Sequence, residues 1–285
     1  MDQNYHWIRT SLFSSTDNWH FILKEGINPL INNLDKETLM AHQIELNYIR
    51  GENIRLAFLS SDQNAIKLAQ LVDAHFKRYF SNTQLQKHGF IPGKDLFMPF
   101  PENTIQYGLY DIDVYPEIEK YQVEQELAHL IIHSFEENFD DQTVLTLALY
   151  LHLVILKILH SSFPEYLAIL PGLYKGYADM SIGNGALSDI PEMLENTTLL
   201  REITNDVFTE NNFAHFTAEL AWLQKWFEIC QNKIISSIEG HRFEKTHADL
   251  STLVAKHLGL SGFFQAMLYN LIGTSIDYIP KSSIK

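Results

Sequence analysis

The stretch that decides the fold is IELNYIRGENIRLAF at residues 44–58. Its alternating apolar and polar residues predict two strands around a turn at Gly51, because glycine tolerates positive φ. Successive side chains of a strand point to opposite faces, so this hairpin has one apolar face and one polar face with a single arginine. The apolar face holds Ile44, Leu46, Tyr48, Ile54, Leu56 and Phe58, and the polar face holds Asn47, Arg55 and Ala57.

The length of the turn decides which residues of the hairpin face each other. A two-residue loop of Gly51 and Glu52 would place Asn47 opposite Leu56 and mix the two faces, since a slip of one residue flips every side chain. A three-residue loop, 50–52, keeps the apolar residues together. The sequence therefore predicts the three-residue loop, with Asn47 opposite Arg55, Leu46 opposite Leu56 and Ile44 opposite Phe58.

Length and composition set broad limits on the protein. A chain of 285 residues with 46% hydrophobic content can bury a core as one large or two intimate domains. The single cysteine, Cys230, excludes an intrachain disulfide framework and predicts a reducing, cytoplasmic location. The N-terminus lacks the pattern of a signal peptide. The net charge of −14 argues against a protein that grips nucleic acid phosphates.

The apolar stretch 143–159, TVLTLALYLHLVILKIL, is the one segment that resembles a membrane span. It contains His152 and Lys157 and falls short of the ~20 residues that a span needs. We expect a buried helix and no membrane contact.

Strand and helix patterns predict an α+β fold. Up to residue 121 their order is β-α-β-β-α-β, that of a ferredoxin-like split β-α-β unit with an antiparallel sheet. In the helix at 63–80 the expected buried residues are Ile66, Leu68, Ala69, Leu71, Val72 and Phe76. The expected elements are strand 6–14, helix 19–34 with a kink or split at Pro29, hairpin 43–59, helix 63–80, loop 82–101 and strand 104–114.

Residues 122–285 have the periodicity of helices and no proline-glycine linker separates them from 1–121. We therefore predict a single continuous domain, 1–285, with an α+β part at 1–121 and a mostly helical part at 122–285. The expected helices are 123–138, 143–160, 190–209, 213–237 and 246–272, the last broken at Gly259, with an irregular stretch at 171–184.

Few motifs in the sequence carry chemistry by themselves. His129 and His133 lie one helical turn apart, a spacing that zinc sites use, but no glutamate lies between them, and packing at a helix boundary is the simpler explanation. The sequence contains no phosphate-binding loop and no serine hydrolase motif. Glu117 and Glu119 can face one side as a solvated cluster or as an anchor for a cationic or amide-rich ligand.

Three segments of the sequence resemble a known family. The segment NPLINNL at 28–34, the hairpin NYIRGENIRLAF at 47–58 and the later YDIDVYPEIEKY at 110–121 are similar in order and form to the C-terminal, elimination-type domain of lantibiotic dehydratases. The same domain occurs alone as thiopeptide-type bacteriocin biosynthesis proteins of bacteria. The resemblance covers most of the chain, and its best match is the later motif, at Tyr115, Pro116, Glu117, Glu119 and Tyr121.

The resemblance implies maturation of a ribosomally synthesised peptide, of lanthipeptide or thiopeptide type, without a cofactor or metal. Family members eliminate glutamate from glutamylated serine or threonine, and relatives build a pyridine ring from two dehydroalanines. Elimination needs a base for the α-proton and cations for the enolate and the departing carboxylate. In the family, arginines and a histidine serve these needs.

This sequence departs from the family at most of those positions. Asn47 and Ala57 stand where the hairpin of the family has arginines, and Asn53 stands where it has histidine. Lys120 replaces the arginine of the later motif, and Gln265, in QAMLYNLIG, replaces a late histidine. The candidate catalytic residues are therefore Arg55 and Lys120, with an unidentified base. The candidate substrate-binding residues are Asn47, Tyr48, Asn53, Glu117, Glu119, Tyr121 and Gln265.

Three functional interpretations remain open at this point. The protein is a lyase that eliminates glutamate, a non-catalytic derivative that binds the precursor peptide or a partner enzyme, or an α+β protein that shares only the fold. In the first two cases its partners are the precursor peptide and a separate glutamyl-tRNA-dependent dehydratase. The sequence leaves the oligomeric state open, a homodimer included.

Overall fold

The computed structural model describes residues 5–87, 99–112, 121–162, 197–208, 221–238 and 243–276. The chain forms two compact units. The first comprises Met1–Phe139 and His257–Gly259, and the second comprises Asp140–Lys256 and Leu260–Lys285. The expectation that both parts form one continuous domain stays a prediction.

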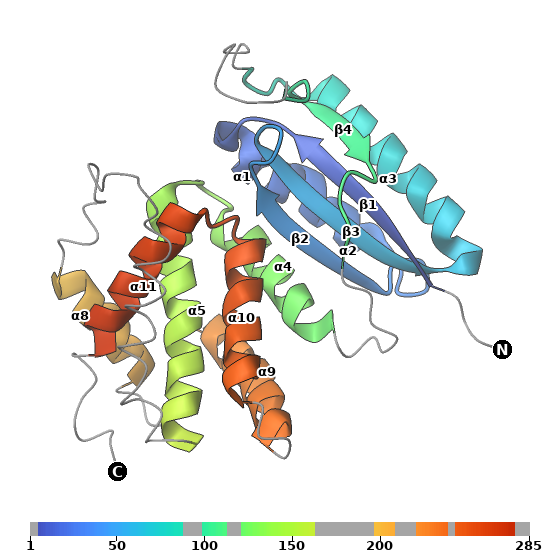
Figure 1. Cartoon of the computed structure of the whole chain (residues 1–285). Coiled ribbons are helices and arrows are strands. Elements are labelled where there is room, and N and C mark those ends of the chain that lie inside the picture. The colour runs from blue at the N-terminus through green and yellow to red at the C-terminus, as the bar shows by residue number, and fades with distance from the viewer. Residues whose placement is uncertain are drawn as a thin grey trace. The chain divides into compact units, whose positions relative to one another are not determined.

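The first unit is built on an antiparallel sheet that has four strands in the described part of the chain (Figure 1). The strands are β1 (Tyr5–Phe13), β2 (Ala41–Asn47), β3 (Asn53–Ser61) and β4 (Thr104–Tyr107), in the spatial order β2-β3-β1-β4. Helices separate β1 from β2 and β3 from β4, which gives the predicted β-α-β-β-α-β order. The predicted α+β class, with helices following the sheet, is confirmed.

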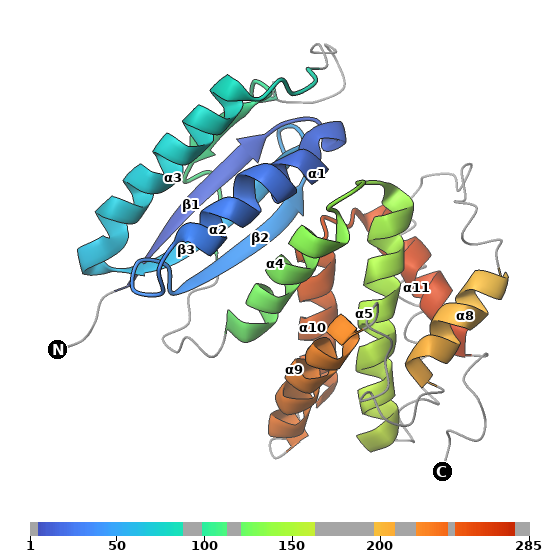
Figure 2. The same cartoon turned by 180° about the vertical axis from the view of Figure 1, so that it is seen from behind.

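Helices cover one face of this sheet (Figure 2). After β1 come η1 (Thr16–Asn18), α1 (Trp19–Phe21), the π-helix η2 (Ile22–Ile27) and α2 (Asn28–Asn33). The long helix α3 (Asp62–Asn82) follows β3, and α4 (Gln122–Ser134) lies against β2. Residues 122–134, predicted as the start of the helical part, thus belong to the same unit as the sheet.

The apolar face of the hairpin is the inner surface of the core. Every apolar residue of the two paired strands that the alternation assigned to this face is at most 1% exposed. The helices supply Trp19, Ile22, Leu23 and Ile27 from the first crossover and Leu68, Val72 and Phe76 from α3. Burying this surface is the main driving force for the fold, at about 25 cal/mol for each Å² of apolar area removed from water.

Two residues of α3 contradict the predicted core, and a third, Ala69, is only half-buried. Ile66 is 74% exposed and Leu71 is 41% exposed. The buried residues Leu68, Val72 and Phe76 recur every four positions, so only a narrow stripe of α3 meets the sheet, and the other two side chains lie outside that stripe.

The hairpin register differs from the prediction by two residues. Asn47 pairs with Asn53, Glu45 with Arg55 and Ile44 with Leu56. The loop is therefore 48–52, and two of its residues have positive φ, Arg50 at 61° and the predicted Gly51 at 110°. A register shift of two residues keeps every side chain on its face of the sheet, so the apolar and polar faces are those that the sequence predicts.

Pro29 is accommodated without splitting the first helix. The N–H of Asn28 bonds to the carbonyl of Leu23, five residues back, in the π-helical turn that precedes the proline. Proline cannot donate to the next carbonyl and clashes with it in a regular α-helix, so a wider turn at this point relieves the conflict.

The predicted strand 104–114 is shorter in the structure. The β4 ladder ends at Tyr107, and Gly108 follows with φ +66°. The last two residues of the predicted strand, and the irregular stretch predicted at 171–184, lie outside the described residues.

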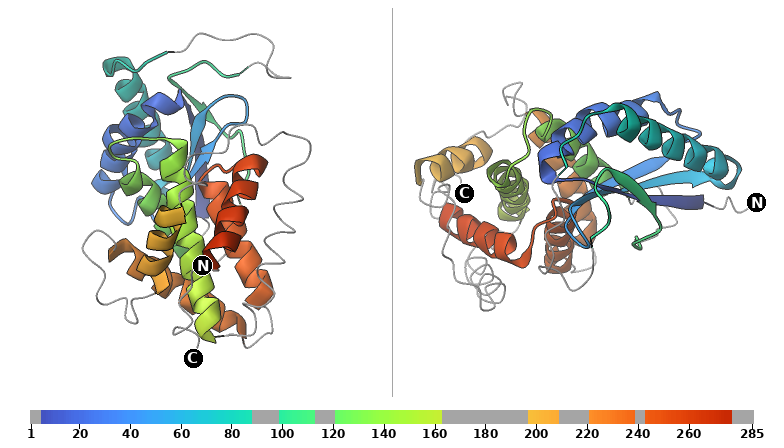
Figure 3. Two further views of the ribbon diagram at one scale, coloured as in Figure 1. Left: turned by 90° about the vertical axis from the view of Figure 1, so that its left-hand side faces the viewer. Right: turned by 90° about the horizontal axis from the view of Figure 1, so that it is seen from above.

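The second unit consists of helices in its described part. They are α5 (Asp141–Ser162), α8 (Thr197–Phe208), α9 (Ala221–Ile238), α10 (Phe243–His257) and α11 (Gly262–Ile276), with only the last residue of α10 assigned to the first unit. Figure 3 shows α5 in the middle of the helices of this unit. Trp226 donates to the Leu151 carbonyl at 3.1 Å and Lys157 to the Val207 carbonyl at 2.6 Å, which joins α5 to α9 and α8.

Helix α5 is the buried helix that the sequence predicts. Asp141–Leu159 is long and apolar enough for a membrane span by length and composition, yet 72% of its most apolar window is buried within the protein. From Leu147 to Leu159, nearly every apolar side chain is at most 5% exposed. The same apolar length therefore serves as the core of the helical unit.

The break at Gly259 is confirmed, and it has a second role. Gly259 has φ +64°, and the N–H of Leu260 bonds to the Ala255 carbonyl at 2.9 Å, as in a Schellman helix end. A Cβ on Gly259 would lie 2.4 Å from the carbonyl oxygen of Leu46. Next to it, the His257 ring Nδ1 donates to the Ile44 carbonyl at 2.6 Å. The turn 257–259 thus packs on the edge strand β2.

Gly259→Ala should therefore destabilise the protein more than Gly108→Ala. Both glycines have φ near +65°, which costs about 1–2 kcal/mol for an L residue, but a Cβ at Gly108 meets nothing within 4 Å. We expect thermal melting to show a clearly larger loss for Gly259→Ala. Equal losses for the two variants would mean that the backbone of Leu46 moves away at little cost.

The second unit should lose stability in mild acid. Burial lowers the pKa of His152 to about 4, and burial together with His152 lowers the pKa of His247 to about 4. The unfolded chain then binds more protons than the folded one between pH 6.5 and 4, so the stability present above pH 6.5 is lost as the pH falls toward 4. The loss amounts to roughly 3 kcal/mol for a fully buried histidine.

His152→Leu should flatten this pH dependence. We expect the difference in melting temperature between pH 7.5 and 5 to shrink relative to wild type, while the exposed His133→Gln, on α4, leaves it in place. An unchanged slope in His152→Leu would show that other groups cause the acid sensitivity.

Candidate functional site

The face of the sheet opposite the helices carries the polar residues, and we call it the polar face. Cross-strand pairing places Arg9 beside Ala57 and Ser11 beside Arg55, while Glu45 pairs with Arg55 from the other side. Side chains of directly paired residues lie on the same face. The polar face is therefore formed by Arg9 and Ser11 of β1, Gln43, Glu45 and Asn47 of β2, and Asn53, Arg55 and Ala57 of β3.

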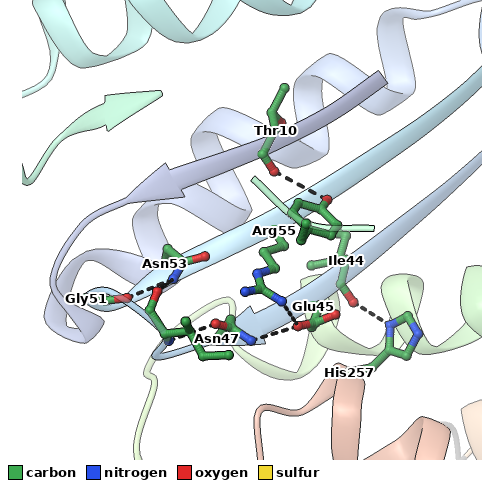
Figure 4. Close-up of polar contacts among 10 residues, drawn as sticks. Thr10, Ile44, Glu45, Asn47, Gly51, Asn53, Arg55 and His257 are labelled. Carbon is green, nitrogen blue, oxygen red and sulfur yellow. Dashed lines mark hydrogen bonds and ion pairs between the residues drawn. The ribbon is translucent and has the colours of Figure 1, made fainter. Parts of the chain in front are cut away.

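Arg55 is bound by its neighbours on β2 (Figure 4). Its Nη1 lies 2.8 Å from Oε1 of Glu45, and the amide of Asn47 donates to the same oxygen, also at 2.8 Å. The side chains of Arg55 and Glu45 are only 15% and 9% exposed. The cation that the sequence singles out is thus neutralised by a buried carboxylate, so the pair carries no net charge.

Tyr110 lies over this pair. The guanidinium carbon of Arg55 is 4.9 Å from the centre of the Tyr110 ring, and the hydroxyl of Tyr110 contacts the Thr10 carbonyl at 3.4 Å. Arg9 donates to the backbone carbonyl of Tyr110 at 2.8 Å. Burial raises the pKa of Tyr110, Glu45 raises it further, and Arg55 and Arg9 oppose the rise. Tyr110 is therefore a neutral phenol between two arginines.

The asparagines predicted to bind substrate close the hairpin turn. Oδ1 of Asn47 accepts the N–H of Ile49 at 2.8 Å, and the amide of Asn53 donates to the carbonyls of Ile49 and Gly51 at 3.2 and 2.7 Å. Asn53 is 1% exposed. Tyr48 is 45% exposed, and its ring lies 5.4 Å from that of Trp19. Of these three residues, only Tyr48 presents a large side chain to solvent.

The remaining predicted residues divide into two groups. Tyr121 is 1% exposed, in an apolar cluster with Ala41 and Leu59, and its ring meets Trp7 at 5.0 Å. Gln265 lies on α11 in the second unit and donates to the Leu260 carbonyl at 2.8 Å, at the start of that helix. Both have structural contacts, and their predicted role in substrate binding stays a prediction. Glu117, Glu119 and Lys120 lie outside the described residues.

The histidine pair on α4 does not gather further ligands. The rings of His129 and His133 are 4.3 Å apart, and His133 contacts Glu136 at 2.8 Å. Burial, with His129 nearby, lowers the pKa of His42 to about 4. Among the described residues no three histidine, cysteine or acidic side chains converge as metal ligands.

A shallow groove between α3 and β4 is separate from the polar face. It has a volume of about 460 Å³. Its cation, Lys77, already pairs with Asp73 at 2.9 Å, and Asp73 also accepts the hydroxyl of Tyr107 at 2.5 Å. The lining residues are Lys77, Phe80, Ser81, Asn103, Thr104, Ile105 and Gln106.

Sequence reasoning missed three residues of the polar cluster, namely Glu45, Tyr110 and Arg9. Glu45 is two residues before Asn47 on β2, so it lies on the same face of the strand. With the observed register, alternation alone places Glu45 beside Arg55. Arg9 alternates with Trp7 and Ser11 on β1, so pairing β1 with β3 would have found it. Tyr110 follows β4 and carries no pattern that predicts its contact with Arg55.

Glu45→Gln should destabilise the protein strongly, because it leaves the Arg55 charge buried without its carboxylate. Breaking one partner of a buried pair costs about 3 kcal/mol or more, whereas Asp73→Asn, in the exposed pair with Lys77, should cost less than ~1 kcal/mol. Urea unfolding of both variants checks this. A loss for Glu45→Gln no larger than for Asp73→Asn would show that water reaches Arg55 freely.

Comparison with known proteins gives a fold relationship. No protein-family model matches the chain, and no curated protein matches it in sequence. Among solved structures, the pyridine synthase TbtD, from thiomuracin biosynthesis, superposes with a TM-score of 0.66 at 13% identity. The match covers 94% of this chain and 97% of that one. The chain therefore shares, over nearly its whole length, the fold of an enzyme of thiopeptide biosynthesis.

Proposed function

We propose that this protein takes part in the maturation of a ribosomally synthesised peptide, and that it binds the peptide without eliminating glutamate from it. The observation that carries the proposal is the structural similarity to a thiopeptide biosynthesis enzyme over 94% of the chain. The lantibiotic-dehydratase-like motifs of the sequence, in the hairpin and at 110–121, support the same pathway.

The chemistry of the polar face favours binding over elimination. Elimination of glutamate needs a cation that is free to receive the departing carboxylate and a base for the α-proton. Glu45 already occupies that place at Arg55, at 2.8 Å. Asn47 and Asn53 stand where the family has an arginine and a histidine, and both are engaged in closing the turn. Residues that act together in catalysis lose most of their effect when several are replaced.

A second candidate function is synthesis of a pyridine ring. The similarity to TbtD favours it, because that protein is described as a pyridine synthase. The glutamate lyase remains a third, with Arg55 and Lys120 as its cationic residues. In each case the partner is a precursor peptide, a separate glutamyl-tRNA-dependent dehydratase supplies modified residues, and the protein acts in the bacterial cytoplasm.

Two synthetic peptides separate these functions. One carries an O-glutamyl serine, and the other carries two dehydroalanines in place of serines. Binding is followed by fluorescence anisotropy and the products by mass spectrometry. We expect measurable binding and unchanged masses. Loss of glutamate from the first peptide would establish the lyase, and a new aromatic absorbance with the second would establish ring formation.

If glutamate loss is observed, the Arg55→Gln variant shows whether Arg55 takes part in the reaction. If glutamate loss occurs and depends on Arg55, the buried pair with Glu45 opens during the reaction. If neither peptide binds, peptide maturation by this protein is contradicted.

A further inference from the structure

Arg9 and Arg55 lie on one face of the sheet and enclose the same tyrosine. Arg9 pairs across the ladder with Ala57, one alternate position beyond Arg55, so both guanidinium groups start from neighbouring points of the polar face. The residues between them, Ser11 and Ala57, are small and at most 1% exposed. Tyr110 contacts Arg55 with its ring and Arg9 with its carbonyl.

The two ion pairs of this cluster differ in their exposure to solvent. Glu45, 9% exposed, neutralises Arg55. Arg9 is 31% exposed, and its carboxylate partner is Asp111, whose side chain is 99% exposed. An ion pair with a fully exposed carboxylate contributes little, because water competes for both groups. Within the described part of the polar face, Arg9 is therefore a cation whose carboxylate partner can be exchanged, in a chain whose net charge is −14.

We propose that Arg9 binds a carboxylate of the peptide ligand, and that Asp111 occupies this place until the ligand displaces it. A guanidinium binds carboxylates with two parallel hydrogen bonds, which a flexible lysine cannot do. Arg9 is preorganised for this, since its bond to the Tyr110 carbonyl fixes the guanidinium on the sheet. The inference rests on the proposed peptide binding and adds its chemical specificity.

The net charge of the protein further limits which peptides can bind at Arg9. A net charge of −14 repels strongly acidic peptides at long range. The ligand that fits is therefore a peptide with one glutamate or aspartate flanked by neutral or basic residues. The contact between Arg55 and the Tyr110 ring does not involve the Asp111 carboxylate, so displacing that carboxylate from Arg9 removes no bond of Arg55.

A display library of random peptides tests the proposal. Selection on the full-length wild-type protein should enrich peptides with a single acidic residue. A selected peptide and its Glu→Gln or Asp→Asn version are then compared by fluorescence anisotropy. Arg9→Gln should weaken binding of the acidic peptide about tenfold and leave its neutral version unchanged. Asp111→Asn should strengthen binding of the acidic peptide about threefold, because the internal competitor is removed.

Matched variants on α3 exclude a general charge effect. Arg78→Gln and Asp73→Asn change the net charge by the same amounts and should leave the affinity unchanged. Enriched peptides without an acidic residue, or an Asp111→Asn variant no tighter than Asp73→Asn, would overturn the carboxylate site while peptide binding stands. A selection that enriches no peptide would overturn both.

Discussion

The structure of the first unit depends on an ion pair that is buried on the polar face of its sheet, between the edge strand β2 and its neighbour β3. Arg55 and Glu45 face each other across the β2–β3 ladder, both nearly excluded from solvent, and Asn47 donates to the same carboxylate oxygen. Two charges out of water are costly unless they are paired with good geometry, so any other register of this hairpin would leave one of them unmatched. The pair therefore adds specificity to a hairpin whose apolar face alone allows even-numbered slips.

The same pair decides what the polar face can do. A guanidinium that is neutralised within the protein is poorly suited to receive a departing carboxylate, whereas it can hold Tyr110 in place through its ring. The accessible charge is on the neighbouring strand, at Arg9. The polar face thus divides into a fixed part, built on Arg55 and Glu45, and an exchangeable part at Arg9 and Asp111.

Alternation of residues sufficed to predict the sheet, and local turn chemistry limited the accuracy. The period of two gave both faces of the hairpin correctly even though the register was wrong by two residues. The error arose because the side chains of Asn47 and Asn53 bond to the turn and end the ladder early. Helical periodicity likewise predicted α3, but not that its contact stripe is too narrow to include Ile66. The strand register and the width of a helix contact depend on how several elements pack together, and the sequence of a single helix or strand does not determine them.

The candidate site was less predictable, because it is assembled across strands. Reading along β3 finds Arg55 and then Ala57, at a position where the family that the sequence resembles has an arginine. Reading across the ladder finds Arg9 directly opposite Ala57. Paired side chains on one face have Cβ atoms about 5 Å apart, so a guanidinium supplied from either strand reaches nearly the same region. A comparison of β3 alone therefore registers the loss of an arginine at Ala57. The sheet nevertheless keeps an arginine in this region, because Arg9 of β1 lies opposite Ala57.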